Sequence, residues 1–358
     1  MSLSIGIVGL PNVGKSTLFN ALTDNEILAA NYPFATIEPN TGIVPVPDAR
    51  MPVLAEMFGS ERILPATVTF VDIAGLVAGA SQGEGLGNKF LASIRNTQAI
   101  AHIVRAFEND DIVHVSNRVS PKDDIEVINA ELCLADIQTI DGRLQRLQKD
   151  AKGNPKAREA IDYLEGLKAK LDDGVLLSTL PDLDMEVIYD LHLLTAKPVI
   201  YVFNVDEESL SNEARLQELR DLVAPSRAIF ISAKLEDELR GLDEADAAEL
   251  LEGYGVSENG LNQLIHTAYE TLGLQSYLTA GPKEVRAWTI HRGDTAPQAA
   301  GVIHTDFMRG FIAAQVVDYD DLVAAGSMAA AKSAGKVRTE GKEYVMRPGD
   351  VVEFRFNV

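Results

Sequence analysis

The feature that most constrains this chain is an uninterrupted G-x-x-x-x-G-K-S motif near its amino terminus, running from Gly9 to Ser16. The residues before it, 3–8, are mostly apolar and β-branched, which is typical of a buried parallel strand, and residues 16–22 favour a helix. A strand, a glycine-rich turn and a helix start in this order form a phosphate-binding loop, because the first helix amides and the helix dipole favour an oxyanion. The pattern therefore predicts a nucleoside triphosphate site.

Each residue type in this loop has an expected role. Lys15 would stabilise the charge of the outer phosphates, and the Ser16 hydroxyl would ligate Mg²⁺. The residues expected to contact the nucleotide here are Asn12, Val13, Gly14, Lys15, Ser16 and Thr17.

Two later segments fit the metal side of such a site. The apolar run 66–71 ends in Asp72-Ile73-Ala74-Gly75, a D-x-x-G pattern in which Asp72 would hold the metal through water and the Gly75 amide would sense the γ-phosphate. Thr36 lies in a proline-containing loop after the first helix, where a switch protein keeps a metal-ligating threonine. Leu76 stands where Ras-type GTPases place the glutamine that orients the attacking water, so another residue must do this.

The base side departs from the guanine pattern. GTPases carry N-K-x-D after the next buried strand, whereas this chain has Asn204-Val205-Asp206-Glu207. Glutamate is one methylene longer than the aspartate that reads guanine, and unpaired polar groups are costly to bury. We therefore expect weakened guanine preference and tolerance or preference for adenine. The residues expected on the base side are Asn204, Val205, Glu207, Ser232, Ala233 and Lys234.

The remaining chain suggests three domains. Apolar residues spaced three and four apart between 137 and 171, interrupted by Gly153-Asn154-Pro155, predict an antiparallel helical coiled-coil arm at 123–196. This arm would divide a nucleotide-binding domain into 1–122 and 197–275. The last part, 276–358, reads as a separate small mixed domain, in which the apolar run Ala300–His304 looks like a strand.

Composition limits the compartment and the partners. The 358-residue chain has a net charge of −21 and one cysteine, Cys133, which favours a cytoplasmic protein that is not broadly attracted to polyanions. No apolar run has membrane-spanning length. From residue 277 onward ten Lys/Arg balance ten Asp/Glu, so a nucleic-acid contact would use a local patch. One weak candidate is the cluster Lys332, Lys336, Arg338 and Lys342.

With these motifs placed, the chain closely resembles the YchF/Obg-like ATPase family over essentially its full length. The match rests on the segments above and on Ala296–Gly301, Asp306-Phe307 and Gly310-Phe311. The resemblance implies an α/β fold in which a Ras-like P-loop domain of Obg type carries the inserted arm and a C-terminal TGS domain with a β-grasp fold. It also implies ATP preference over GTP and association with the ribosome, through rRNA or ribosomal protein, by way of the TGS domain and the arm.

The resemblance further implies two catalytic details. His114 occupies the place of a family histidine thought to replace the missing glutamine, and a histidine in a polar loop could orient water or act as a base. Asn12 matches an asparagine that related GTPases use to recruit K⁺, and K⁺ binding here is a hypothesis.

The leading hypothesis is a slow, Mg²⁺-dependent ATPase that works as a conformational switch on the ribosome, with no membrane or DNA partner. Two alternatives stay open: a GTPase of the same fold whose Glu207 still reads guanine, and a nucleotide-gated binding module whose hydrolysis is incidental.

Overall fold

The computed structural model describes most of the chain and divides it into two compact units. The first unit takes its described residues from Met1–Asn25, Thr36–Gly42 and Thr69–Leu264, and the second from Glu26–Ala35, Ile43–Val68 and Ile265–Val358. The predicted limits of the three domains stay predictions. The residues that the structure describes are 3–23, 40–73, 86–109, 118–150, 154–239 and 241–357.

One sheet of the chain has the strand order β2-β4-β1-β5-β6-β7, and its strands β1, β5, β6 and β7 belong wholly to the first unit. β1 pairs in parallel with β4 and β5, β5 with β6, and β6 with β7. Every residue of β1, β5 and β6 is buried, as their apolar sequences predict. The P-loop α/β fold is thus confirmed. The strands are β1 (Ser4–Val8), β2 (Thr41–Pro45), β4 (Thr67–Asp72), β5 (Ala99–Arg105), β6 (Val199–Asn204) and β7 (Arg227–Ile231).

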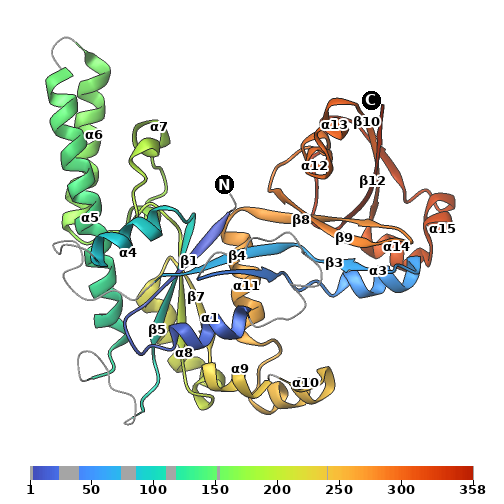
Figure 1. Ribbon diagram of the computed structural model, residues 1–358, viewed down its shortest axis with the longest axis horizontal. Helices are drawn as coiled ribbons and strands as arrows, with labels where there is room; N and C mark the ends of the chain where they lie inside the picture. The colour runs from blue at the N-terminus through green and yellow to red at the C-terminus, as the bar shows by residue number, and fades with distance from the viewer. Residues whose placement is uncertain are drawn as a thin grey trace. The chain divides into compact units, whose positions relative to one another are not determined.

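Helices connect these strands, as parallel pairing requires. The phosphate-binding loop leads directly from β1 into α1, and the arm helices follow β5 (Figure 1). Helices α1 (Lys15–Thr23), α4 (Leu86–Arg95) and α8 (Glu213–Val223) connect strands of this sheet, and α9 (Ala233–Leu239), α10 (Glu244–Gly253) and α11 (Gly260–Thr271) follow its last strand.

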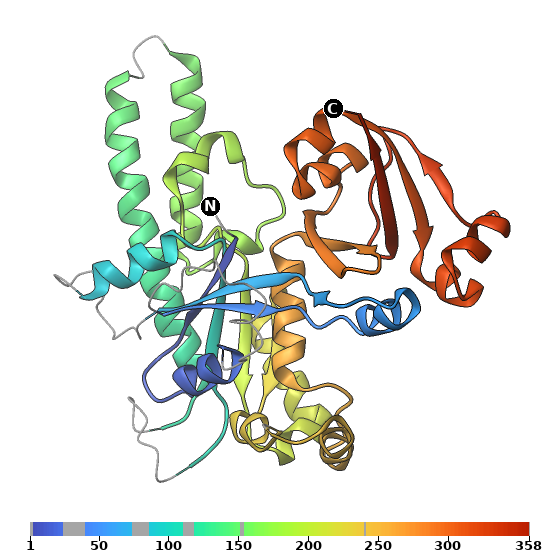
Figure 2. The same cartoon turned by 45° about the vertical axis from the view of Figure 1, so that its right-hand side comes forward.

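Two long helices, α5 (Pro121–Asp150) and α6 (Pro155–Asp172), lie, apart from the first residues of α5, within the range 123–196, for which the sequence predicts an arm. They run side by side in both views (green in Figures 1 and 2). Asn154 caps α6, because its side chain accepts a hydrogen bond from the Ala157 amide. Among the described residues, no helix is long and apolar enough to span a membrane. The buried seam of α6 is Ala157, Leu164, Leu167 and Leu171.

Short elements lead from α6 back to β6 and then on to α8. They are η1 (Leu177–Thr179), α7 (Met185–Ile188) and η2 (Tyr189–Leu191) before β6, and η3 (Glu208–Ser211) after it.

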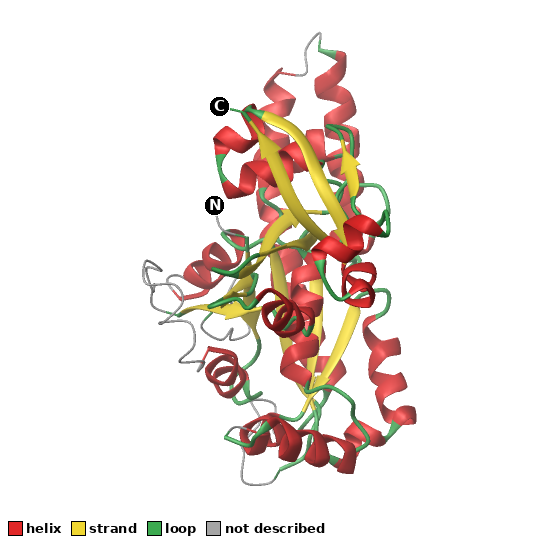
Figure 3. Ribbon diagram, turned by 90° about the vertical axis from the view of Figure 1, so that its right-hand side faces the viewer, coloured by secondary structure: helices red, strands yellow, loops and turns green. Residues whose placement is uncertain are grey.

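The second unit contains a sheet with the order β11-β10-β12-β8-β9-β3. β8–β9, β10–β12 and β10–β11 pair antiparallel, and β3 joins the edge in parallel with β9. In Figure 3 the strand that leads to the C-terminus lies beside a second long strand, with helical turns next to them. The strands are β3 (Ile63–Leu64), β8 (Leu274–Ala280), β9 (Val285–His291), β10 (Phe311–Asp318), β11 (Arg338–Glu340) and β12 (Asp350–Phe356).

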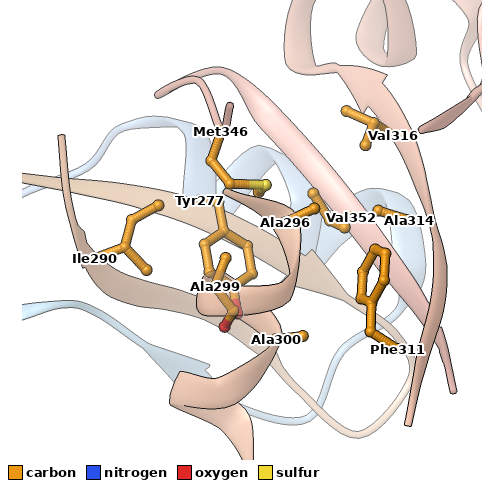
Figure 4. Packing of buried hydrophobic residues seen from close by; sticks show 10 residues of the cluster. All are labelled: Tyr277, Ile290, Ala296, Ala299, Ala300, Phe311, Ala314, Val316, Met346 and Val352. Atoms are coloured by element: carbon orange, nitrogen blue, oxygen red, sulfur yellow. The ribbon is translucent and has the colours of Figure 1, made fainter. Parts of the chain in front are cut away.

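Helices of this unit close an apolar core against the sheet. Figure 4 shows Tyr277 and Phe311 from the sheet beside alanines of α12. The helices are α3 (Arg50–Phe58), α12 (Ala296–Ile303), α13 (Thr305–Arg309), α14 (Tyr319–Ala325) and α15 (Met328–Ser333).

One secondary-structure prediction is wrong. The run Ala300–His304 was expected to be a strand, but residues 300–303 belong to α12. Thr295 and Gln298 form a capping box, and Pro297 lies in the first turn, where its missing N–H costs nothing. A short apolar run has no periodicity that separates strand from helix, and the capping residues upstream decide the outcome.

Candidate functional site

The phosphate-binding loop has the backbone of an anion cradle. Asn12 and Gly14 adopt positive φ angles of 63° and 94°, and the Leu18 amide donates to the Gly14 carbonyl 3.0 Å away as α1 begins. A Cβ at Gly9 would lie 2.8 Å from the Ile103 carbonyl oxygen, so the loop needs glycine there. This alternation of backbone conformations turns successive amides towards one concavity, which favours an anion.

The loop and the end of β4 line one cavity of about 540 Å³. Five of the residues predicted to contact phosphate lie in its wall, together with Asp72 from β4. Val13, the sixth, is buried, and its carbonyl faces β6 instead. Residues far apart in sequence thus meet in the wall of one cavity. The lining residues are Leu10, Pro11, Asn12, Gly14, Lys15, Ser16, Thr17 and Asp72.

In this cavity the Lys15 ammonium forms an ion pair with the Asp72 carboxylate. The parallel register of β1 and β4 sets Asp72 opposite Ile7, and the Asp72 amide donates to the Asn40 carbonyl at 2.8 Å. Both partners are partly buried, with side chains 11% and 20% exposed. The two opposite charges therefore compensate each other within this cavity.

Asn204 ties the phosphate-binding loop to the base-side loop. Its Nδ2 donates to the Val13 carbonyl at 3.1 Å, and its Oδ1 accepts from the Ala233 amide at 3.1 Å. A Cβ at Gly14 would overlap that Nδ2, so this glycine also makes room for the amide. The side chain is buried, and both of its polar atoms contact the backbone. In this structure Asn204 thus holds two loops together, and its predicted place on the base side stays a prediction.

Glu207 and Lys234 form an ion pair at the ends of β6 and β7. The Lys234 Nζ lies 2.7 Å from Glu207 Oε1, and the side chains are 73% and 16% exposed. The ammonium lowers the pKa of Glu207, while the carboxylate raises the pKa of Lys234. Val205 is buried and its amide donates to the Ile231 carbonyl at 2.9 Å, which fixes the spacing of the two strand ends.

The base-side loop continues into α9 through two buried polar residues. Ser232 Oγ accepts from the Leu235 amide at 3.3 Å, as a helix cap does. Glu236 Oε1 accepts from the Gly260 amide at 2.7 Å, at the start of α11, and burial raises the pKa of this carboxyl to about 7. Sequence reasoning missed the role of Glu236, although the acid after S-A-K was visible.

Comparison with known proteins identifies the family. Proteins named "Ribosome-binding ATPase YchF" match over 100% of both chains, with 52% identity to that of Haemophilus influenzae and 50% to that of Bacillus subtilis. The chain belongs to the YchF family. Two sequence families match parts of it: one described as "50S ribosome-binding GTPase" over residues 4–141, and YchF-GTPase_C, described as "Protein of unknown function (DUF933)", over residues 274–357.

A solved structure of the YchF family has the same fold. The Schizosaccharomyces pombe YchF GTPase superposes with a TM-score of 0.87 at 38% identity, covering 99% of this chain and 98% of that one. A GTP-binding protein from Pyrococcus horikoshii matches with a TM-score of 0.59 at 19% identity, over 99% of this chain and 100% of that chain, which shows the fold alone.

Four of the predicted YchF-family positions lie outside the described residues: Thr36, Gly75, Leu76 and His114. The described part of the site therefore comprises the phosphate-binding loop, Asp72 and the base-side loops. The metal-ligating role of Thr36, the γ-phosphate contact of Gly75 and the catalytic role of His114 stay predictions.

Proposed function

We propose that this chain is a Mg²⁺-dependent ATPase of weak intrinsic activity that acts as a nucleotide-controlled switch and associates with the ribosome. The observation that carries the proposal is the cavity in which the phosphate-binding loop meets Asp72. Its residues fit both groups: the backbone cradle suits an oxyanion, and a hydroxyl with a carboxylate suits Mg²⁺.

The chain's own residues would divide the work as follows. Lys15 leaves Asp72 for the outer phosphates, where its charge stabilises the reacting group, and Asp72 and Ser16 become free to hold the metal, with Thr36 as a further ligand. A bound Mg²⁺ would supply charge neutralisation at the phosphate oxygens. His114 would orient the attacking water, since Leu76 cannot do so.

Lys15→Ala tests the phosphate site. We expect loss of ATP binding and of Mg²⁺-dependent turnover, whereas Lys342→Ala, at an exposed lysine of the second unit, should keep both. Unchanged ATP affinity and turnover in Lys15→Ala would overturn the assignment.

His114→Ala, assayed with and without ribosomes, should keep ATP affinity and lose turnover. Equal turnover in K⁺ and Na⁺ would contradict a K⁺ role for Asn12.

The base preference has a rival reading. The relatives from bacteria are named ATPases, whereas the yeast structure and the family at residues 4–141 are named GTPases. Glu207 in place of aspartate favours adenine in our proposal. Competition of ATP against GTP for the same site decides between adenine and guanine preference. A large preference for GTP would contradict the proposed adenine preference.

Ribosome association is supported by the names of the relatives and of the family at residues 4–141. The arm at 123–196 and the domain at 276–358, for which we propose a TGS fold, are the candidate contact regions. Cosedimentation with ribosomes in the ATP, ADP and nucleotide-free states tests the switch. Equal binding in all three states would contradict a nucleotide-controlled switch.

A further inference from the structure

The base end of the site carries a charge arrangement that the sequence did not predict. Glu207 follows β6, and Lys234 is the second residue of α9, which follows β7. The Lys234 Nζ and the Glu207 Oε1 lie 2.7 Å apart. Both loops are held to the phosphate-binding loop, because Asn204 bonds to Val13 and Ala233 at the same time. The pair thus lies at the carboxyl edge of the parallel sheet, on the elements that flank the phosphate cradle, where α/β folds bind ligands.

The chemistry of guanine makes this pair informative. A carboxylate that reads guanine accepts two hydrogens from the base edge, one at each oxygen, so both oxygens must be available. Lys234 engages Oε1 of Glu207, and its charge compensates the carboxylate. Adenine needs one acceptor for its amino group, which the second carboxylate oxygen can supply.

We infer that Lys234 is a specificity-determining residue of this site. Because it pairs with one oxygen of Glu207, the carboxylate cannot accept two hydrogen bonds from guanine and keeps one acceptor for the amino group of adenine. The inference rests on the proposed nucleotide-binding function and names the residue that sets its base preference. It differs from an effect of the longer glutamate side chain alone, because it makes the preference depend on the partner of the carboxylate.

The exposure of Lys234 indicates that its ion pair contributes little to the stability of the fold, which leaves base selectivity as its role. The Lys234 side chain is 73% exposed, so its ion pair is screened by solvent and adds little to folding. Lys234 also lies 3.8 Å from Glu238 one turn along α9, a second partner that competes weakly for the ammonium. Lys234 is the main cause of the lowered pKa of Glu207, and the neighbouring Asp206 carboxylate opposes this effect only weakly.

The test compares ATP and GTP affinities of four full-length proteins by competition with one fluorescent ATP analogue in the presence of Mg²⁺. Lys234→Met removes the charge and keeps the apolar stem, Lys234→Arg keeps the charge, and Glu238→Gln is the matched control on the same helix. We expect the ratio of GTP to ATP affinity to rise about tenfold in Lys234→Met, the discrimination of one paired base contact. The ratio should stay near the wild-type value in Lys234→Arg and Glu238→Gln.

The ratio separates a selective role from a structural one, because loop damage would weaken both nucleotides equally. An unchanged ratio in Lys234→Met, or equal loss of both nucleotides, would overturn the inference while wild-type ATP binding leaves the proposed function standing. If the wild-type chain binds neither nucleotide, the proposed function fails, and the inference fails with it.

Discussion

The two units of this chain bury different kinds of side chain. The first unit buries polar and charged groups within and around its parallel sheet, among them His102, Arg105, Asp136 and Glu236. Over its described residues, the second unit fully buries one charged side chain, Asp350, and packs an otherwise apolar cluster of aromatic and small residues.

The difference reflects what each interior has to hold. Burying a polar group costs free energy unless the group is hydrogen-bonded, so we expect most buried polar side chains of the first unit to hold backbone groups in place. In the first unit they fasten loops: Asn204 joins two loops, Asp136 holds residues 194–195, and Glu236 holds the start of α11. In the second unit Tyr277 donates to the Ala299 carbonyl at 2.9 Å and otherwise fills space. The following changes test this contrast.

Tyr277→Ala should have the largest effect. The side chain is fully buried in the apolar cluster, so its loss leaves a cavity and should lower the free energy of unfolding of the second unit by about 4 kcal/mol. Urea unfolding measures the loss. Tyr277→Phe, the matched control, removes the bond to Ala299 alone and should cost about 1 kcal/mol. Comparable losses for the two variants would mean that the hydroxyl, and not packing, supports this core.

Asp136→Ala should be nearly as damaging in the first unit, but for another reason. The carboxylate accepts from the Leu194 amide at 2.9 Å and from the Thr195 amide and hydroxyl at 2.7 Å. Its removal leaves these buried donors without a hydrogen-bond acceptor. We expect the free energy of unfolding, measured with urea, to fall by about 3 kcal/mol. Asp141→Ala, on the same helix, removes a solvent-screened ion pair to Lys168 and should cost far less than Asp136→Ala. Equal costs would contradict the fastening role of Asp136.

Local patterns made much of this molecule predictable from sequence. The phosphate-binding loop is one contiguous motif, and apolar residues follow one another in the strands or recur every three or four residues in α6. The structure places these strands and the α6 seam as expected. The P-loop motif also predicted the cavity residues, because a nucleotide site needs fixed residue types at fixed spacing. Asp72 could be placed at the same sheet edge because it ends a strand next to β1, and its metal role stays a prediction.

The contacts between distant segments could not be predicted. Asn204 lies 191 residues from its partner Val13, and β3 pairs with β9 across more than 200 residues. Nothing in either sequence segment marks these partners, since any carbonyl could accept the amide and many edges could pair. The Lys15–Asp72 and Glu207–Lys234 ion pairs were missed for the same reason. The sequence predicted each residue's ligand but not its partner in the protein.

His102→Phe should change how stability depends on pH. Burial lowers the pKa of His102 to about 3, because no partner compensates a charge there, and the ring lies 5.3 Å from Tyr201. The unfolded chain takes up a proton near pH 6.5, so the wild-type protein loses stability as pH falls below this value. Between pH 7.5 and 5 this contribution is about 2 kcal/mol. His102→Phe should lack that part of the loss in urea unfolding, and identical pH profiles would contradict it.

Glu236→Gln should alter the pH profile in the opposite direction and by less. The pKa of Glu236 is raised to about 7, above its unfolded value of 4.5, so its stabilising contribution is fully present below pH 4.5 and is lost as pH rises through 7. The amides of Gly260 and Leu261, at the positive end of α11, favour the charged form and limit the rise of this pKa. Between pH 6 and 8 we therefore expect a loss of about 1 kcal/mol. Glu238→Gln, exposed on the same helix, is the control and should keep the wild-type profile. Because His102 and Glu236 respond with opposite sign, the double variant should show a flatter profile than His102→Phe at alkaline pH and a flatter one than Glu236→Gln at acid pH. That pattern would assign the acid loss to His102 and the alkaline loss to Glu236. If both single variants instead changed stability at the same end of the pH range, burial would not be the cause of the two pKa shifts.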